Sequence, residues 1–361
     1  MAINNSDLDN PRLFKQYDAD GMLDRIHEMP GQCQQAWQMA LDFELPPAYA
    51  EVERVVILGM GGSAIGGDIV RSLTINQARL PIFICRDYEL PAFVDGRTLV
   101  IASSYSGMTE ETLSAFEQSL RTDAPKLVIT TGGKLETIAR SQHIPVFRFD
   151  YRAQPRAALP FSLFPILCFC HRLGFIPDMS ANVVETLNVL PEMSSRINEN
   201  VPLSRNQAKQ LASQLYGRLP VVYGADFIAA VAHRWKTQLN ENGKSWAFYE
   251  VFPELNHNAV AGYQFPPEVA NKVTVVMLHS DLLPERLKIR YRVTAQLLDS
   301  AGVSRQQVEG EGQSQLSHIM SLVLYGDYTS YYLALLNRID PTPVKNIEYV
   351  KEHLRKEKTK W

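Results

Sequence analysis

The sequence predicts an α/β fold with two doubly wound domains, each a parallel sheet flanked by helices, plus helical N-terminal, bridging and C-terminal segments. Three observations support this class. Short apolar runs rich in Val and Ile alternate with longer segments of helical periodicity. Glycine-rich or hydroxyl-rich turns follow several of these runs, and the alternation stops and then restarts in the second half of the chain. Continuous apolar runs of this length are typical of strands buried on both faces of a parallel sheet.

Composition limits the class of protein further. The chain has 361 residues, of which 45% are hydrophobic and 21% charged, which is ordinary globular usage for about two to three domains. The formal charge is 36 − 39 = −3, so no basic field favours nucleic acid or an anionic membrane. No apolar run approaches the ~18 residues of a membrane span, and the polar start lacks the charged and apolar regions of a signal peptide. We therefore expect a cytoplasmic protein with no nucleic-acid or membrane partner.

The cysteines do not suggest a disulfide framework or a metal site. Cys168 and Cys170 are one residue apart inside an apolar run, and Cys33 and Cys85 are isolated. None of these spacings matches a zinc motif. We expect thiols buried in the core.

The first half predicts one doubly wound domain. A helical opening covers about residues 20–43, and strands then alternate with crossover helices. After Thr109, for example, Leu113, Phe116 and Leu120 recur at helical spacing and form one apolar stripe. The expected strands are Arg54–Gly59, Pro81–Arg86, Thr98–Ser104, Lys126–Thr131 and Pro145–Asp150.

The second half predicts a divergent copy of the first, after a mostly helical bridge from about Leu159 to Leu211. Sequence identity between the halves is weak, so the repeat rests on the pattern alone. The expected domains are residues 1–155, 156–215 as the bridge, and 216–361. The expected strands are Leu219–Gly224, Trp246–Val251 and Lys272–Ser280, and the expected helices are a segment around residues 228–239, Pro284–Ser300 and Gln315–Asn337.

A last helix is predicted near the C-terminus. Thr342 can cap its start and Pro343 suits the first helical position, where a missing N–H does no harm. In the helix that follows, Val344, Ile347 and Leu354 share one stripe, and Lys351 interrupts it.

The glycine-rich turn Gly59–Gly67 follows the first expected strand. Glycines let backbone N–H groups approach an anion, and the helix N-terminus adds its positive dipole end. The spacing Gly59-x-Gly61-x-x-Ala64 also fits a degenerate dinucleotide motif, and Asp87 ends the next strand where a ribose-binding acid could lie. An NAD-dependent dehydrogenase and a tight turn with no ligand therefore remain alternatives.

A second turn favours a phosphate monoester over a dinucleotide. Ser104, Ser106 and Thr109 place three hydroxyls around a glycine at a helix start, which makes a neutral group of donors suited to one phosphate. A dinucleotide requires no such second group at this position. The structural alternative is an ordinary Ser/Thr helix cap. The polar turn Thr130–Gly133 follows the next strand at the same carboxyl edge, where open α/β sheets bind ligands.

Five segments carry a more specific pattern, in this order: LGMGGSAIGGD, SSYSGMTEET, PRAALPFSLFPIL, LNENGKSWAFYEVFPELNHN and DPTPVKNIEYVKEHL. Together they resemble the bifunctional phosphoglucose/phosphomannose isomerases, which are built from two sugar isomerase (SIS) domains. The resemblance covers about residues 50 to 355. It implies two SIS-type domains and an aldose–ketose isomerase that interconverts glucose 6-phosphate or mannose 6-phosphate with fructose 6-phosphate. It also implies no metal, no cofactor, and a homodimer with shared active sites.

The resemblance assigns the phosphate site to hydroxyls and glycines of the first domain. Three hydroxyls would hold the phosphate, and two glycines and a serine would line the site. These residues are Ser104, Ser106 and Thr109, and Gly61, Gly62 and Ser63.

The same resemblance assigns the chemistry to residues of the later motifs. Arg156 would stabilise the enediolate, Glu241 would be the base, and His257 would help open the sugar ring. Thr342 and Lys351 would complete the pocket. The chemistry independently requires such groups: a carboxylate that reaches both C1 and C2, a cation where negative charge gathers, and a group that titrates near neutral pH. The subunit that supplies His257 and the preferred sugar are left open.

Each of these residues also has a structural reading. Glu241 could be a solvated residue at a helix end, His257 a loop histidine, and Arg156 the partner of a carboxylate. Lys351 could extend past the stripe to solvent, but it is preferred to Lys345, which points about 100° away from Val344. Four further titratable residues are interpreted as decoys or structural groups: Glu250, Glu254, His233 and His318.

Two positions depart from the family's pattern. Met108 stands where the phosphate turn usually has Asn, which removes one polar side chain and leaves the three hydroxyls. Ala259 stands where Glu is common after the NHN motif, so any role of that carboxylate is missing here. Phosphate binding is expected to survive the first change, and the second bears on efficiency or substrate range.

Outside the enzymes, the main alternative is a sugar-phosphate-binding regulator that keeps the pocket without turnover. Such regulators ordinarily carry a DNA-reading helix-turn-helix, and the first 45 residues offer no basic recognition helix. The sequence therefore favours the isomerase.

Overall fold

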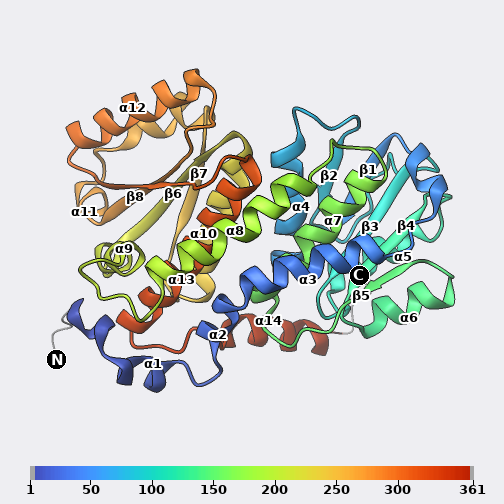
Figure 1. Cartoon of the computed structure of the whole chain (residues 1–361), viewed down its shortest axis with the longest axis horizontal. Helices are drawn as coiled ribbons and strands as arrows, with labels where there is room; N and C mark the ends of the chain where they lie inside the picture. Colours follow the sequence, from blue (N-terminus) through green and yellow to red (C-terminus); the bar gives the residue numbers. More distant parts are fainter. Residues whose placement is uncertain (1–4, 358–361) are drawn as a thin grey trace. The chain divides into compact units, whose positions relative to one another are not determined.

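The structure is a computed structural model that describes residues 5–357, and the chain forms two compact units. One unit contains the described residues up to Glu28 together with Ala181–Lys345, and the other contains Met29–Ser180 together with the described residues from Asn346 onward. We name them the β6–β9 unit and the β1–β5 unit after their sheets (Figure 1). Residues 1–4 of the polar start, on which the signal-peptide expectation partly rests, lie outside the described residues.

The β1–β5 unit contains a five-stranded parallel sheet with the order β2-β1-β3-β4-β5. The strand order reverses between β1 and β3, because β2 pairs on one side of β1 and β3 on the other. Open α/β sheets bind ligands at such a switch point, outside the carboxyl ends of the strands. The strands are β1 (Arg54–Leu58), β2 (Ile82–Cys85), β3 (Thr98–Ser104), β4 (Lys126–Thr130) and β5 (Val146–Arg148).

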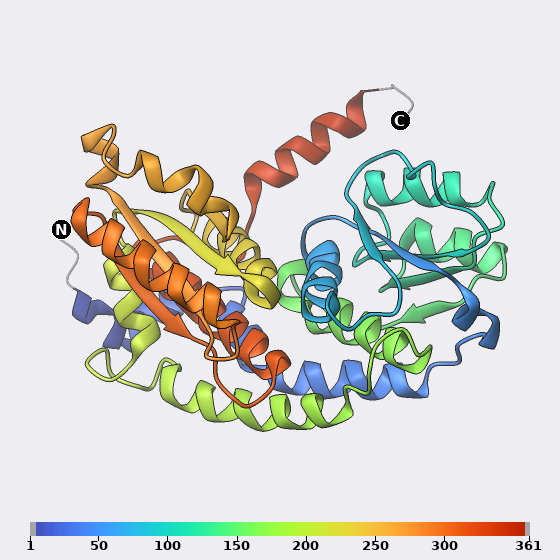
Figure 2. The same ribbon diagram turned by 90° about the horizontal axis from the view of Figure 1, so that it is seen from above.

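Helices cover both faces of this sheet (Figure 2). Leu113 and Phe116 of the predicted stripe are buried against the strands, where they join Val56, Val100 and Val128 in one apolar core. Helices α3, α4 and α7 form another layer, in which α7 packs against both α3 and α4. The helices are α3 (Met29–Asp42), α4 (Gly61–Thr74), α5 (Glu110–Ser119), α6 (Gly133–Ser141) and α7 (Pro160–Arg172), with short 3₁₀ turns η2 (Pro47–Glu51) and η3 (Pro155–Ala158).

The β6–β9 unit repeats the same order with four parallel strands, β7-β6-β8-β9. This confirms the predicted divergent copy. Strand β9 was not predicted, because it lies at the edge of the sheet and its sequence SRQQVE is polar, with only Val308 buried. The strands are β6 (Leu219–Ala225), β7 (Phe248–Phe252), β8 (Val273–His279) and β9 (Ser304–Glu309).

A long buried helix, α13, forms the centre of this unit, and α9 and α10 pack against it. The N-terminal helices belong to the same unit, since Tyr331 of α13 donates a hydrogen bond to Asp18 and His27 pairs with Glu199 at 2.9 Å. The helices are α1 (Pro11–Tyr17), α2 (Met22–His27), α8 (Ser180–Ile197), α9 (Gln207–Leu215), α10 (Ala229–Glu241), α11 (Pro267–Ala270), α12 (Glu285–Ser300) and α13 (Gln315–Leu336). Short 3₁₀ turns are η1 (Asn5–Asp9), η4 (Asp226–Ile228), η5 (Glu254–His257) and η6 (Ala259–Gly262).

The predicted fold class is confirmed: two parallel sheets of doubly wound order are flanked by helices, and helical segments precede, join and follow them. The bridge is mostly helical, as expected, and consists of α7, α8 and α9. The boundaries at residues 155 and 215 stay a prediction. None of the helices within residues 5–357 combines the length and the apolar character of a membrane span.

The cysteines are largely the core thiols that the sequence predicts. Cys33, Cys168 and Cys170 are buried, while Cys85 on the edge strand β2 is half-buried. Burial raises the pKa of the Cys170 thiol to about 12. The buried thiols are therefore protonated at neutral pH and act as apolar packing groups, whereas the Cys85 thiol donates to the Glu89 carbonyl oxygen.

The last helix differs from its prediction. Helix α14 (Lys345–Lys356) begins two residues later than the expected start at Pro343. The reason is local: Asp340 accepts a hydrogen bond from the Thr342 N–H at 2.8 Å, which closes a turn there instead of a helix cap. None of its described residues is buried, and Ile347 and Leu354 are 41% and 46% exposed. The stripe that favoured Lys351 over Lys345 is therefore not an inward face in the described chain, and the choice of Lys351 stays a prediction.

Candidate functional site

The switch point of the β1–β5 unit is surrounded by helix N-termini. Helix α4 starts directly after β1, and α5 starts after the turn that follows β3. The N-cap residues of these helices, Met60 and Thr109, make no side-chain capping hydrogen bond. First-turn N–H groups of a helix have no partner within the helix, and the dipole leaves this end positive. The N-termini of these two helices can therefore bind an anion.

Hydroxyl groups line the same position. Ser104 Oγ lies 2.9 Å from Thr109 Oγ1 and accepts a hydrogen bond from the Gly107 N–H at 3.1 Å. Ser106 Oγ accepts from the Met108 N–H at 3.2 Å. The Thr109 hydroxyl thus bonds to another hydroxyl and does not cap α5, which was the structural alternative for this turn. The arrangement supplies neutral donors to a doubly charged ligand without bringing a counter-charge.

Two glycines lock this turn against the turn after β4. Gly107 has φ +63°, and a Cβ there would lie 1.8 Å from the Gly132 carbonyl oxygen. Gly133 has φ +76°, and its Cβ would lie 2.3 Å from the Ser106 carbonyl oxygen. Only glycine fits either position. The polar turn predicted around Thr130–Gly133 therefore holds the hydroxyl turn in place.

The glycine-rich turn after β1 packs directly against the backbone of Pro155 and Arg156, so that Gly62 has no room for a side chain. A Cβ on Gly62 would lie 2.9 Å from the Pro155 carbonyl oxygen and 3.4 Å from the Arg156 nitrogen. Arg156 lies in η3 and is 2% exposed. Ser63 Oγ accepts a hydrogen bond from the Tyr105 N–H at 3.2 Å, which joins the two predicted turns. The β1–β5 unit thus gathers the predicted phosphate-site residues and Arg156 at one edge of its sheet.

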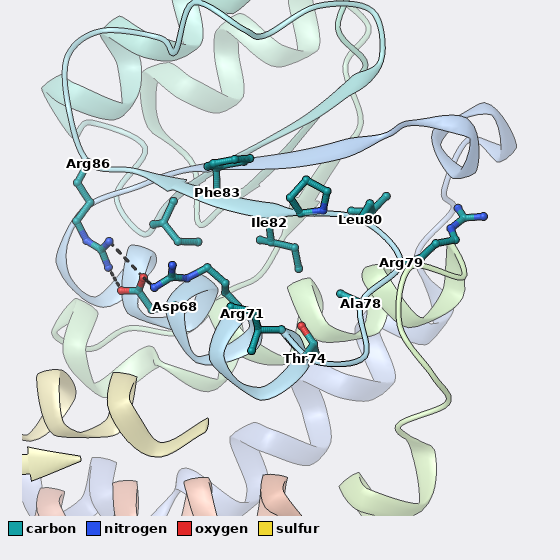
Figure 3. Close-up of a pocket in the computed structure, with 12 residues that line it drawn as sticks. Asp68, Arg71, Thr74, Ala78, Arg79, Leu80, Ile82, Phe83 and Arg86 are labelled. Carbon is teal, nitrogen blue, oxygen red and sulfur yellow. Dashed lines mark hydrogen bonds and ion pairs between the residues drawn. The ribbon is translucent and has the colours of Figure 1, made fainter. Parts of the chain in front are cut away.

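A cavity of about 550 Å³ in this unit lies elsewhere, along the edge strand β2 (Figure 3). Arg71 and Arg86 line it, and both pair with the buried carboxylate of Asp68. None of the predicted site residues lines this cavity. It is therefore separate from the switch point described above.

In the β6–β9 unit, Glu241 is the last residue of α10, and Lys244 links it to the turn before the C-terminal helix. The Lys244 ammonium donates to the main-chain carbonyl oxygens of Glu241 and Pro341, the latter at 2.9 Å. Thr342 follows directly and is 7% exposed. The structure thus links the predicted base to the segment that carries Thr342, which was predicted to complete the pocket. Sequence reasoning singled out Glu241 in the NENGK motif and passed over Lys244, although the lysine belongs to the same motif.

His257 lies at the carboxyl ends of the strands of this sheet, and Glu241 lies at their amino ends. It ends η5, just after the carboxyl end of β7, and its neighbour Asn256 fixes the turn on α12 through Thr294 at 2.8 Å and Arg290 at 3.1 Å. Helix α10 runs back from the carboxyl end of β6, so Glu241 lies at the amino end of β7. The five residues of β7 span about 17 Å at a rise of about 3.3 Å each. Within one chain, the unit does not bring Glu241 and His257 together.

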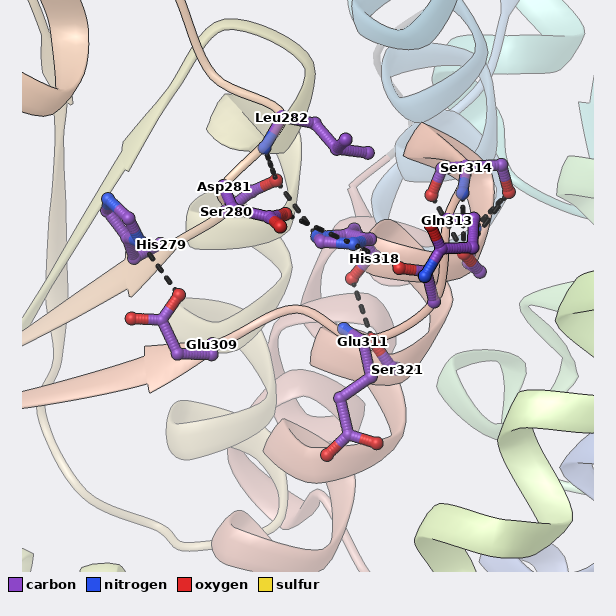
Figure 4. Close-up of polar contacts among 12 residues, drawn as sticks. His279, Ser280, Asp281, Leu282, Glu309, Glu311, Gln313, Ser314, His318 and Ser321 are labelled. Carbon is purple, nitrogen blue, oxygen red and sulfur yellow. Dashed lines mark hydrogen bonds and ion pairs between the residues drawn. The ribbon is translucent and has the colours of Figure 1, made fainter. Parts of the chain in front are cut away.

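The second switch point, at β6 and β8, has a different character (Figure 4). Ser280 Oγ lies 2.9 Å from His318 Nδ1, and both side chains are buried. His279 pairs with Glu309 at 2.7 Å. His318 is therefore a satisfied core residue, as predicted. Within residues 5–357, no group of three or more His, Cys, Asp or Glu side chains is placed to hold a metal ion.

The decoy residues take part in local contacts. Glu254 accepts a hydrogen bond from Asn258 at 2.9 Å, and His233 stacks on Tyr249 with ring centroids 4.7 Å apart. Met108, which departs from the family pattern, is 53% exposed, and its sulfur accepts from the Lys134 N–H. The second departure, Ala259, begins η6, where its N–H donates to Asn258.

The fold and the hydroxyl-lined switch point define a two-domain protein of the sugar isomerase (SIS) class. A family model described as the bacterial phospho-glucose isomerase C-terminal SIS domain matches residues 204–354. The chain belongs to the bifunctional phosphoglucose/phosphomannose isomerase family, whose members are enzymes. A protein of that name from Caldicellulosiruptor bescii is 39% identical over 92% of this chain and 98% of its own length. Another, from Aquifex aeolicus, is 37% identical over 84% of this chain and 90% of its own length.

Solved structures support the same fold. A hypothetical protein of Thermus thermophilus superimposes with a TM-score of 0.74 at 18% identity, covering 98% of this chain and 94% of that chain. A glucose-6-phosphate isomerase like protein from the same organism gives a TM-score of 0.62, also at 18% identity, covering 96% and 98%. At this identity the likeness concerns the fold alone.

Proposed function

We propose that this chain is an aldose–ketose isomerase that interconverts glucose 6-phosphate and mannose 6-phosphate with fructose 6-phosphate. The observation that carries the proposal is the switch point of the β1–β5 unit, where two uncapped helix starts meet three hydroxyls and the turn at Gly61–Ser63. This donor set suits one phosphate monoester, and the name of the family supplies the sugar.

In the proposed reaction, Glu241 takes the proton from C2 of the open-chain aldose and returns it to C1. The electron pair of the C2–H bond forms the C1=C2 double bond of the cis-enediol, and the π pair of the C1 carbonyl moves onto O1, where negative charge gathers. When C1 takes up the proton, the O2–H proton passes to O1 and the C2 carbonyl forms. Arg156, whose guanidinium is always charged, stabilises that charge. Thr342 and Lys351 complete the pocket. No metal or cofactor takes part, and a cytoplasmic location stays a prediction.

We further propose a homodimer in which a second copy supplies His257. Glu241 and His257 of one chain lie at opposite ends of β7, a strand that spans about 17 Å. The base and the ring-opening group must both reach carbons at one end of the same sugar. A pair of sites that exchange this histidine meets the requirement, and two-fold symmetry gives both sites the same composition.

Steady-state assays with a panel of aldose and ketose 6-phosphates test the activity. Fructose 6-phosphate should yield both glucose 6-phosphate and mannose 6-phosphate, with solvent deuterium appearing at C2. If fructose 6-phosphate raises the melting temperature but no sugar is turned over, the regulator alternative wins. If NAD raises it instead, the dehydrogenase alternative wins.

Mixing two inactive variants tests the shared site. Glu241→Gln and His257→Asn dimers, once subunits have exchanged, should regain about one quarter of wild-type activity. Half of the dimers are then mixed, and one of their two sites carries both intact residues. If Glu241 and His257 of one chain form the site, the mixture stays inactive.

A further inference from the structure

The cavity along β2 combines an apolar wall with one charged end (Figure 3). It is lined by residues of the edge strand β2 and of helix α4, and its volume is about 550 Å³. Sites for small molecules usually have about 300–1,000 Å³ and are mostly apolar with a few polar groups. Ile82 and Leu80 are buried in the wall. Phe83 adds a half-exposed ring whose centroid lies 4.9 Å from that of Phe93.

The charged end is built around the Asp68 carboxylate, whose side chain is only 9% exposed. Arg86 donates two hydrogen bonds to this carboxylate. The Arg71 guanidinium lies 3.8 Å from the same carboxylate and makes no hydrogen bond to any residue within 5–357. A guanidinium carries five N–H donors. Arg71 therefore offers donors to a group that enters the cavity.

Arg79 also lines the cavity, but its guanidinium is engaged elsewhere. It donates to the Ala50 carbonyl oxygen at 3.1 Å and lies 5.9 Å from the centroid of the Phe175 ring. The other residues that line the cavity in the described chain are uncharged. The charge that a ligand meets at the closed end therefore comes from Asp68, Arg71 and Arg86.

The charge balance of this end selects among anions. Two positive side chains, Arg71 and Arg86, face one negative side chain, Asp68, which leaves one net positive charge. A monoanion neutralises this charge, whereas a phosphate dianion would bring excess negative charge beside a buried carboxylate. The planar guanidinium also matches the two oxygens of a carboxylate. The balance therefore favours a carboxylate over a phosphate.

We propose that this cavity binds a small monocarboxylate that carries an apolar or aromatic body. Its carboxylate accepts hydrogen bonds from Arg71 and Arg86, and its body covers Ile82 beside the ring of Phe83. The hydroxyl-lined switch point differs in both respects, because it offers neutral donors and lies elsewhere in the unit. The inference does not depend on the proposed function.

Equilibrium dialysis of the full chain against radiolabelled phenylacetate tests the proposal. We expect one molecule bound per chain with a dissociation constant of about 1 mM or lower, as suits a ligand of about ten heavy atoms. Acetate lacks the ring and 2-phenylethanol lacks the charge. Each should therefore compete at least about 10-fold more weakly than unlabelled phenylacetate.

Variants then locate the bound molecule. Arg71→Met should weaken phenylacetate binding about 10-fold or more, because it removes charge-assisted hydrogen bonds. Arg71→Lys keeps the charge without the planar guanidinium and should give an intermediate affinity. Arg140→Met removes a 62% exposed arginine of α6 and is the charge-matched control that should bind normally. The Arg71 side chain is itself 47% exposed, so its variants should unfold at the wild-type temperature.

A large excess of fructose 6-phosphate should leave phenylacetate bound, because none of the residues at the hydroxyl-lined switch point lines the cavity. Displacement by fructose 6-phosphate, or equal affinity of Arg71→Met and wild type, would place phenylacetate at another position and overturn the inference. A wild type that does not bind phenylacetate overturns it as well. If Phe83→Ser then changes the sedimentation velocity of the protein, the cavity is a contact between copies of the chain instead.

Discussion

The two sheets share one strand order but carry different side chains at their carboxyl edges. In the β1–β5 unit, hydroxyls and glycines surround two helix starts that have no side-chain cap. In the β6–β9 unit, the helices that follow β6 and β8 also start without a side-chain cap. Helix α13, which follows the neighbouring strand β9, starts with a capping box formed by Ser314 and Ser317. The Glu185 carboxylate adds hydrogen bonds from the Gln313 N–H and from Ser317 Oγ. The carboxyl edge of the first sheet is prepared for an external anion, whereas the carboxyl edge of the second sheet holds a carboxylate of its own chain.

The difference shows that strand order alone does not define a site. The second sheet has the topology to bind phosphate at its carboxyl edge, but Asp281 and Glu309 add negative charge there. Its proposed chemical groups, Glu241 and Thr342, lie at the amino edge, where α10 and α13 end. Binding by neutral donors and proton transfer by titratable groups are thus assigned to different units.

The strongest test of this division is Glu241→Gln. Loss of the base should lower kcat by about 10²–10⁴-fold while KM for fructose 6-phosphate changes little, because the phosphate donors lie in the β1–β5 unit. Steady-state kinetics on both sugars measure the two constants. Glu254→Gln, at an acid of the same unit that is bonded to Asn258, is the control and should keep kcat. A variant Glu241→Gln with near wild-type kcat would show that another group is the base.

Gly107→Ala tests the interlocked turns of the first switch point. The new Cβ meets the Gly132 carbonyl oxygen at 1.8 Å in a left-handed conformation, so unfolding free energy should fall by about 2–5 kcal/mol. Gly174→Ala is the control in the same unit, since Gly174 has φ +71° and open space around it. It should lose only about 1–2 kcal/mol. Thermal unfolding compares the two, and equal losses would contradict the steric argument.

Ser104→Ala against Ser280→Ala compares the switch points directly. Each serine lies at the carboxyl end of the strand that holds the same place in its sheet order. Ser104→Ala removes a hydroxyl from the phosphate, and a hydrogen bond to a charged group contributes about 1.5–3 kcal/mol, so KM should rise about 10–100-fold. Ser280→Ala removes a bond to His318 and should leave KM unchanged. A rise in KM for both variants would place substrate at both switch points.

The sequence predicts those strands and helices whose own residues show the hydrophobic pattern of a buried element. Strands β3 and β4 are entirely buried, so their apolar runs were visible. Strand β9 has one buried residue and a polar sequence, and nothing local distinguishes it from a loop. The start of α14 was misplaced because a turn through Asp340 competes with the helix cap.

The site was predictable where a motif is continuous along the chain, as in the turn from Ser104 to Thr109. Contacts between segments that are far apart in the sequence could not be predicted, because no local pattern encodes them. The contact of Gly62 with Pro155 and the tie from Lys244 to Pro341 depend on packing between elements far apart in sequence. The separation of Glu241 from His257 follows only once the direction of α10 is known.

The smallest expected effect is the change in unfolding free energy when Glu309, at the second switch point, loses its charge. Burial raises the pKa of Glu309, but hydrogen bonds from His279 and Gln307 outweigh it and hold the pKa below its ordinary value. A depressed folded pKa stabilises the protein above the unfolded value of about 4.3, and this contribution is lost as the pH falls through the folded pKa. Glu309 is half-exposed, so Glu309→Gln should lower unfolding free energy at pH 7 by about 0.5 kcal/mol.

The difference in unfolding free energy between the wild type and Glu309→Gln should disappear as the pH falls below about 4.3. The control Glu268→Gln changes an exposed carboxylate and should show no such difference. Denaturant unfolding at several pH values measures it. Equal stability of Glu309→Gln and wild type at pH 7 would show that this carboxylate contributes nothing to folding. The contrast between the two carboxyl edges would then rest on Asp281, Glu185 and the capping box.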